Sequence, residues 1–322
     1  MRVCVVGGGS IGCYLAARIA SKCPKRNAVT VVNRPRQGGS RDGVVRLLLP
    51  DEDVVKGDVQ VSDGMKPLAG QDKFDVVFVT VKRKDTIQAA MEIEDGIREQ
   101  LLDQDTAIIS LQNGMGNVDI INQVIGGHHH APVVLQGVTY IGASLLEPLF
   151  TQHKGVGKTF IGVKEGSDNE RWRSNVEQVA KMLYVSEDEN CSATFEISPL
   201  VWTKLLANTV INPLTAITNQ LNGALLEERY QPLVHQACME FQQVAEKEQV
   251  QLLLNGKTPT EFVNSVCKNT APNTSSMLLD INNKHETEIE AINGYVVRLA
   301  QQHHIEIPIQ TSFYNIVKTM QR

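Results

Sequence analysis

The stretch VCVVGGGSIG at residues 3–12 joins a short apolar run to the glycine pattern GxGxxG. β-Branched residues dominate the run, so we expect a strand that ends at the glycines and a helix that begins directly after them. In such a turn Gly7 permits the tight bend, Gly9 lets a pyrophosphate approach the backbone, and Gly12 lets the helix pack closely on the strand. The free N–H groups at the start of the helix then face the phosphate charge. The stretch therefore predicts a strand–turn–helix that binds a dinucleotide.

The expected cofactor-binding residues of this turn are consecutive in the chain. They are Gly7, Gly8, Gly9, Ser10, Ile11 and Gly12. The glycine pattern alone is a weak indicator, because a glycine-rich turn without a ligand has the same residues. Its place between an apolar run and a helical pattern favours the dinucleotide site.

The first half of the chain alternates short β-branched runs with segments of helical periodicity. We expect strands at residues 2–6, 28–32, 74–81, 106–111 and 133–139, and helices at 10–21 and 84–102. Two further runs, at 151–153 and 159–163, are expected as edge strands. Alternation of this kind predicts βαβ units, and hence a mainly parallel, doubly wound sheet of Rossmann type with helices on both faces.

The pattern of apolar residues changes from about Ser192 onward. Helical periodicity continues through residues 199–219, 232–250, 259–268 and 285–304, and the β-branched runs disappear. We therefore expect an α/β protein of two domains. Residues 1–192 would form the dinucleotide-binding Rossmann domain. Residues 193–322 would form an all-α domain that carries the substrate and catalytic residues.

The composition limits the class of protein. The chain has 322 residues, which suits two domains, and its 42% hydrophobic and 21% charged residues are typical of a soluble globular protein. The net charge of −5 and the lack of a basic face argue against a nucleic-acid partner. The sequence has no apolar run of the roughly 18 residues that a membrane helix needs. The oligomeric state stays open, with a homodimer as one arrangement.

The N-terminus and the cysteines favour a cytoplasmic protein. Three glycines interrupt the first apolar run too early for a signal peptide. The six cysteines, at positions 4, 13, 23, 191, 238 and 267, form no CxxC pair and no tight cluster. That spacing is typical of reduced thiols in a reducing compartment.

The end of the second expected strand indicates which dinucleotide binds. An NAD enzyme usually has an acidic residue there to hold the ribose 2′-OH. This chain has VVNRPR at residues 31–36, with no carboxylate, and Arg34 can bind a 2′-phosphate through charge-assisted hydrogen bonds. NADPH is therefore favoured over NADH. Lys82 ends another strand and is expected near the nicotinamide half of the cofactor. An ordinary surface residue is the alternative for both cations.

Two polar segments are candidates for the chemistry. In LQNGMGN, residues 111–117, the glycines permit close approach of the backbone, and Asn113 offers both a donor and an acceptor. The spacing of Lys204, Asn208 and Asn212 at i, i+4 and i+8 puts an ammonium and two amides on one helical face. A partly buried lysine has a lowered pKa, which suits a proton donor. A simple Asn-Gly turn and a solvated polar stripe are the respective alternatives.

A run of three histidines at residues 128–130 follows two glycines. Three adjacent histidines have poor geometry for one metal ion, so we expect a solvated loop here and no metal site.

At five places the sequence resembles the ketopantoate reductases (2-dehydropantoate 2-reductases). The matching blocks run in order along the chain. They are residues 7–12, NGMG at 113–116, WTKL at 202–205 continuing to NPLTA at 212–216, NTSSML at 273–278 and TEIEAING at 287–294. Residues 33–50 match no family motif, and the three residues after Lys82 are unusually charged.

The resemblance implies a reaction and a set of roles. The reaction is NADPH-dependent reduction of ketopantoate to pantoate, a step of pantothenate and coenzyme A biosynthesis. The resemblance implies that Lys204 is the acid near the keto oxygen, that Asn113 lies beside Lys204 and the nicotinamide, and that Glu288 fixes the substrate hydroxyl. The substrate-binding residues that it implies are Asn208, Asn212 and Ser276, with Asn222 and Asn273 less firmly placed.

Two other functions are compatible with the sequence. One is a related reductase of a different small keto or hydroxy acid, because the motifs specify the chemistry better than the pocket. The other is a non-catalytic protein that binds NADPH as a sensor, because a fold alone does not establish an activity.

Overall fold

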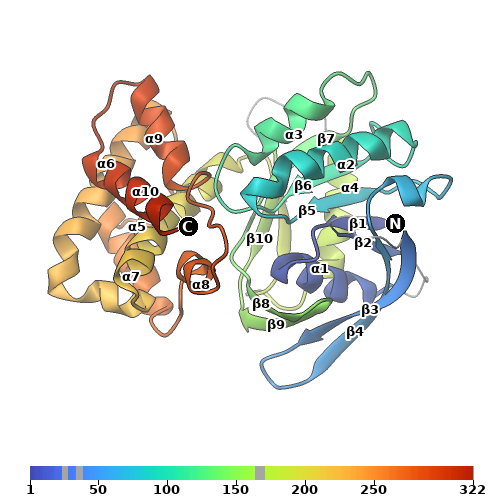
Figure 1. Ribbon diagram of the computed structural model, residues 1–322, viewed down its shortest axis with the longest axis horizontal. Helices are drawn as coiled ribbons and strands as arrows, with labels where there is room; N and C mark the ends of the chain where they lie inside the picture. The colour runs from blue at the N-terminus through green and yellow to red at the C-terminus, as the bar shows by residue number, and fades with distance from the viewer. Residues whose placement is uncertain (24–27, 34–38, 164–170, 322) are drawn as a thin grey trace. The chain divides into compact units, whose positions relative to one another are not determined.

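The computed structural model describes residues 1–23, 28–33, 39–163 and 171–321, and it divides into two compact units (Figure 1). The first unit comprises residues 1–112 and 117–197, and the second comprises residues 113–116 and 198–322. The short segment 113–116 therefore belongs with the C-terminal helices rather than with the strands that precede it. The functional division at residues 192 and 193 stays a prediction.

The first unit is built on one mixed sheet. Eleven described strands follow the order β11-β10-β7-β6-β5-β1-β2-β4-β3-β9-β8. Its centre, from β7 to β4, is parallel, while the pairs β3–β4, β7–β10 and β8–β9 are antiparallel. The strands are β1 (Val3–Val6), β2 (Val29–Val32), β3 (Ser40–Leu48), β4 (Val54–Ser62), β5 (Val76–Val79), β6 (Ala107–Ser110), β7 (Val133–Thr139), β8 (Gly142–Glu147), β9 (Phe150–Gly155), β10 (Thr159–Gly162) and β11 (Cys191–Thr194).

Helices cover both faces of this sheet, which confirms the predicted α/β class. They are α1 (Ser10–Ala20), α2 (Thr86–Arg98), α3 (Asn117–Ile125) and α4 (Arg171–Leu183). Alternate residues of β1 enter two separate cores, because successive side chains of a strand point to opposite faces. Val3 and Val5 pack with residues of α1 and α4, whereas Cys4 and Val6 pack with residues of α2 and α3.

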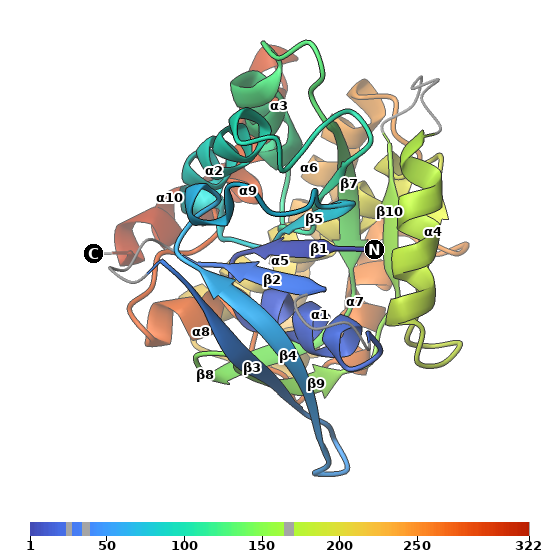
Figure 2. The same ribbon diagram turned by 90° about the vertical axis from the view of Figure 1, so that its right-hand side faces the viewer.

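The two strands expected at the edges of the sheet, at residues 151–153 and 159–163, lie inside it. β9 lies between β3 and β8, and β10 lies between β7 and β11. The sequence did not predict β8 and β11, which occupy the two edges. It also did not predict the hairpin of β3 and β4 (Figure 2). The first half of β3 is exposed and rich in charged residues, so its sequence lacks the apolar run by which the other strands were recognised.

The second unit is all helical in its described residues. Its helices are α5 (Ser198–Thr218), α6 (Gln231–Lys247), α7 (Pro259–Asn269), α8 (Ser276–Asn282), α9 (Asn293–Gln302) and α10 (Pro308–Met320), with short 3-10 turns at residues 222–226 and 228–230. Helix α5 is central and packs against α6, α7, α8 and α10. The single helix expected at 285–304 is wrong in its first part. Residues 285–288 are irregular, residues 289–292 form a turn, and α9 begins only at Asn293.

Candidate active site

The glycine-rich turn between β1 and α1 leaves open space at one position and none at two others. Gly7 has φ +109°, and a Cβ atom there would lie 2.7 Å from Cγ1 of Val81. A Cβ atom on Gly12 would overlap the carbonyl oxygen of Gly7, so the helix packs tightly on the turn. A Cβ atom on Gly9 would meet nothing within 4 Å. The turn is thus closed where helix and strand meet and open at Gly9, where a ligand can approach the backbone.

Two side chains fix this turn. The amide of Gly8 donates a hydrogen bond of 2.9 Å to Oδ1 of Asn33, which directly follows β2. The hydroxyl of Ser10 accepts a hydrogen bond of 3.0 Å from the amide of Leu145 in β8. The sequence did not identify Asn33 as a functional residue. The signal was available, because a polar side chain that ends a buried strand at this edge of the sheet faces the glycine-rich turn.

Only one of the two cations expected at the cofactor lies in the described part of the chain. Arg34 lies outside the described residues. Lys82 follows β5 and is half-buried, and its carbonyl oxygen accepts a hydrogen bond from the amide of Asp85. The position beyond the carboxyl end of a parallel strand is where open α/β sheets bind their ligands.

Helix α5 carries two incompletely buried side chains inside an otherwise buried segment. From Val201 to Ala216 every side chain is buried apart from those of Lys204 and Asn208, which are half-buried. Asn212, the third member of the predicted polar face, is buried. A solvated polar stripe would be exposed along its whole length, so the lysine and the two amides belong to a partly enclosed site.

Lys204, Asn113 and Glu288 form one hydrogen-bonded chain. Nζ of Lys204 donates to Oδ1 of Asn113 over 2.9 Å, and Nδ2 of Asn113 donates to Oε2 of Glu288 over 3.0 Å. An ammonium can only donate and a carboxylate can only accept, so the two partners determine the orientation of the amide. Burial lowers the pKa of Lys204 from its ordinary 10.5 to about 8, and the negative charge of Glu288 opposes this shift. The ammonium can therefore lose its proton near neutral pH.

The backbone around Asn113 has a shape that only glycine permits. Gly114 and Gly116 have φ of +77° and +81°. The amide of Met115 donates a hydrogen bond of 2.8 Å to the carbonyl oxygen of Ala291, and a Cβ atom on Gly114 would overlap that same oxygen. The NGMG segment is thus held directly on the turn that carries Glu288.

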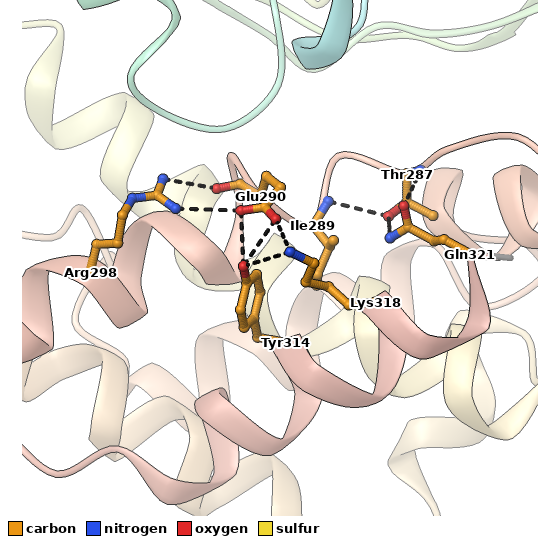
Figure 3. Close-up of polar contacts among 7 residues, drawn as sticks. All are labelled: Thr287, Ile289, Glu290, Arg298, Tyr314, Lys318 and Gln321. Carbon is orange, nitrogen blue, oxygen red and sulfur yellow. Dashed lines mark hydrogen bonds and ion pairs between the residues drawn. The ribbon is translucent and has the colours of Figure 1, made fainter.

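The turn that carries Glu288 is held on one side by Gln321, which directly follows α10, and on the other by side chains of α9 and α10 (Figure 3). Before Glu288, the hydroxyl of Thr287 accepts a hydrogen bond of 2.7 Å from Nε2 of Gln321. After it, the carboxylate of Glu290 accepts hydrogen bonds from Tyr314 and Lys318 and lies 3.5 Å from Arg298. These anchors were not predicted, because Thr287 and Glu290 meet Gln321, Tyr314 and Lys318 only after the helices have packed.

Comparison with known proteins assigns the family. The family model described as ketopantoate reductase PanE/ApbA matches residues 3–166, and the model of the C-terminal part of the same family matches residues 196–321. The chain belongs to the ketopantoate reductase family. The resemblance stated from the sequence is confirmed.

Members of this family from other organisms are similar over the whole chain. The 2-dehydropantoate 2-reductase of Halobacterium salinarum is 32% identical, with 100% of this chain and 99% of that protein covered. The corresponding enzyme of Pyrococcus horikoshii is 27% identical, with 99% and 97% covered. A solved PanE/ApbA family ketopantoate reductase from Ralstonia eutropha has the same fold, with a TM-score of 0.80, 22% identity, and 100% and 98% covered. D-Mandelate dehydrogenase, solved with NADH and anilino(oxo)acetate, also shares the fold, with a TM-score of 0.80, 18% identity, and 100% and 98% covered.

The remaining residues implied by the family lie around α5 and α8. Nδ2 of Asn222 donates to the hydroxyl of Thr270 over 3.0 Å, and its backbone amide donates to the carbonyl oxygen of Asn273 over 3.0 Å. Ser276 is exposed at the first position of α8. Its neighbour Ser275 is buried and caps α8 by accepting from the amide of Leu278. Of the two adjacent serines, Ser276 is therefore the one whose hydroxyl can reach a ligand.

The histidines at residues 128–130 lie between α3 and β7. Nε2 of His128 lies 3.4 Å from Oε1 of Glu94 in α2. Among the described residues no cluster of three or more His, Cys, Asp and Glu side chains is suited to a metal ion. In the same part of the chain, no helix is both long and apolar enough to cross a membrane.

Proposed function

We propose that this protein catalyses the NADPH-dependent reduction of ketopantoate to pantoate, with Lys204 as the general acid. The observation that carries the proposal is the chain of hydrogen bonds from Lys204 through Asn113 to Glu288. It joins an ammonium with a lowered pKa to two polar groups that orient it. The names of the H. salinarum and P. horikoshii relatives support the same reaction.

The glycine-rich turn fits the pyrophosphate of a dinucleotide. The space at Gly9 is open, its backbone is extended, and no described side chain caps the start of α1. The amide groups of the first helical turn can therefore donate to phosphate oxygens. When bound, NADPH would supply a hydride to the substrate carbon. Arg34 would bind the 2′-phosphate, because the sequence at the end of β2 has no acidic residue to hold a ribose 2′-OH.

Lys204 has the protonation state that the reduction requires. Arrival of a hydride at the carbonyl carbon places negative charge on the keto oxygen, and a positioned ammonium stabilises that charge. With a pKa of about 8, Lys204 is charged at neutral pH and can transfer its proton to this oxygen. The alkoxide becomes a hydroxyl, and the lysine is left neutral until it takes a proton from water.

Four polar side chains of the helical unit would position the keto acid. Glu288 would accept a hydrogen bond from the hydroxyl of ketopantoate, and the exposed Ser276 would donate to its carboxylate. Asn208 and Asn212 lie on the same face of α5 as Lys204 and would hold the substrate beside it. Asn222 and Asn273 are further candidates, since they are joined to each other through the backbone. We also propose that the protein acts in the cytoplasm, with the cofactor domain at residues 1–192 and the substrate domain at 193–322.

A second candidate is the reduction of another 2-keto acid. D-Mandelate dehydrogenase has the same fold and was solved with NADH, so the fold is compatible with a different acid and a different cofactor. The discriminating residues would be those that contact the side chain of the acid rather than Lys204 or Asn113.

A substrate panel tests these alternatives. Oxidation of NADPH and of NADH would be followed with ketopantoate, phenylglyoxylate, pyruvate and 2-ketoisovalerate as substrates. We expect the highest kcat/KM for ketopantoate with NADPH. A higher kcat/KM for another acid would move the assignment to the second candidate. Binding of NADPH without turnover of any acid would indicate a sensor and refute both enzyme functions.

A further inference from the structure

Helix α5 contains a proline in its interior. Pro213 lies well before the end of the helix at Thr218. Proline has no backbone N–H, so the carbonyl oxygen four residues earlier loses its helical partner. That oxygen belongs to Thr209, which is fully buried. A buried carbonyl without a donor is costly, so the missing N–H must be replaced by another group.

Asn293 supplies the replacement. Its Nδ2 donates to the carbonyl oxygen of Thr209 over 2.8 Å and to Oε1 of Gln310 over 2.7 Å. Both partner atoms are acceptors, and Nε2 of Gln310 already donates a hydrogen bond to the carbonyl oxygen of Ala237. The amide of Asn293 must therefore point its nitrogen toward them, although its Oδ1 is then buried without a partner among the described residues.

The same residue is joined to the turn that carries Glu288. Asn293 is the first residue of α9 and directly follows that turn. The amide of the next residue, Gly294, donates back to the carbonyl oxygen of Ile289 over 2.9 Å. Ala291 of the turn holds Met115 of the NGMG segment. The side chain of Asn293 thus connects α5, which carries Lys204, to the turn that holds both Glu288 and the segment of Asn113.

We propose that Asn293 is a positioning residue of the reductase, which replaces the N–H that Pro213 removes from α5 and thereby sets Glu288 and Asn113 against Lys204. This role rests on the proposed function for its effect on turnover. Its effect on the ionisation of Lys204 does not, because the geometry of the three side chains is a property of the free protein.

The first test is Asn293→Ala, with Asn283→Ala, an exposed asparagine directly after α8, as the matched control. Because a misplacement of about 1 Å can cost about 100-fold, we expect kcat to fall on the order of 10–100-fold. The Kd of NADPH should stay unchanged, since the glycine-rich turn belongs to the other unit. The pH dependence of Lys204 acetylation, measured by mass spectrometry without substrate, should shift toward lower pH as Glu288 moves away. An unshifted acetylation profile in a folded Asn293→Ala protein would overturn the proposal.

The second test asks whether the bond to Thr209 is responsible. Pro213→Ala restores a backbone N–H that can bond to the carbonyl oxygen of Thr209. In that background Asn293→Ala should lower the free energy of unfolding, and kcat, by less than it does in the wild type. If Asn293→Ala lowered the free energy of unfolding and kcat equally in both backgrounds, the role of the Thr209 carbonyl would be refuted. If Asn293→Ala alone does not fold, a folded double variant supports the proposal, and an unfolded double variant contradicts it.

The two proposals can fail separately. A wild-type protein that does not reduce ketopantoate refutes the proposed function. The acetylation profile and the coupling of Asn293 to Pro213 in urea unfolding would still decide whether Asn293 positions the cluster.

Discussion

The glycine-rich turn and the cluster of Lys204, Asn113 and Glu288 are built in opposite ways. Residues 7–12 are contiguous, and their shape follows from where the backbone leaves no room for a Cβ atom. The cluster joins side chains separated by 91 and 175 residues along the chain. The turn depends on missing side chains, whereas the cluster depends on polar side chains whose positions are set by other segments.

This difference predicts how each region responds to substitution. In the turn, an added side chain acts at its own position, either by blocking a ligand or by preventing packing. In the cluster, a substitution also acts on the orientation and pKa of its partners, because the lysine, the amide and the carboxylate are linked in one chain. A substitution in the turn is therefore expected to affect only its own position, whereas one in the cluster should also change the other two side chains.

The largest effect is expected from Lys204→Ala, which removes the proposed general acid from the cluster. The kcat should fall by about 10²–10⁴, the usual range for a positioned acid or base. The Kd of NADPH, measured by fluorescence titration, should hardly change. Lys247→Ala, an exposed lysine of α6, serves as the control. A Lys204→Ala protein that keeps more than about a tenth of wild-type turnover would show that the proton comes from another group.

Gly9→Val tests the open position of the glycine-rich turn. The extended backbone of Gly9 is one that valine can adopt, and a Cβ atom there meets nothing within 4 Å, so the fold should persist. The side chain would occupy the space of the pyrophosphate. Loss of two charge-assisted hydrogen bonds, about 3 kcal/mol, corresponds to a Kd for NADPH raised on the order of 100-fold.

Two other glycines give the controls for Gly9→Val. Gly127, which also has open space and an ordinary φ, should accept valine without any effect on NADPH binding. Gly12→Val should instead prevent folding, because its Cβ atom would overlap the oxygen of Gly7. Unchanged NADPH affinity in Gly9→Val would place the pyrophosphate elsewhere.

Arg34→Ala tests whether this residue binds the 2′-phosphate of NADPH. Removal of one charge-assisted contact should cost about 1.5–3 kcal/mol, or roughly 10–100-fold in the Kd of NADPH. NADH, which lacks the 2′-phosphate, should bind as before. Equal losses for both cofactors, measured by the same titration, would disprove this assignment.

The smallest effect is expected in the pH dependence of kcat/KM, which should follow the ionisation of Lys204. The free protein has Lys204 with a pKa of about 8, so it is charged below that pH and neutral above it. The kcat/KM for reduction should therefore be level below pH 8 and fall about tenfold per pH unit above it. Glu288 raises the pKa of Lys204, so Glu288→Gln should move this decline to lower pH.

Glu306→Gln, an exposed carboxylate before α10, is the control for that shift and should leave the decline in place. A decline that stays at the same pH in Glu288→Gln, or moves upward, would mean that the carboxylate does not act on Lys204.

Several elements followed from the sequence because neighbouring residues encode them. The strand at Val133–Thr139 has the predicted bounds, and α5 begins and ends one residue before its predicted bounds. In both segments the local pattern of apolar residues coincides with what the fold buries. The strands β3, β4, β8 and β11 were not predicted, because each is partly exposed and lacks a continuous apolar run.

Three features could be predicted from the residues alone: the glycine-rich turn, the helical face of Lys204, and the family to which the chain belongs. Each depends on residues close together in the chain, where sterics and periodicity act directly. The packed structure was needed to show that Glu288 lies in a turn before α9, that α10 anchors this turn, and that Asn293 takes the place of the N–H missing at Pro213. The reason is that these roles depend on which buried donors and acceptors remain unpaired after the helices have packed. No local pattern of residues contains that information.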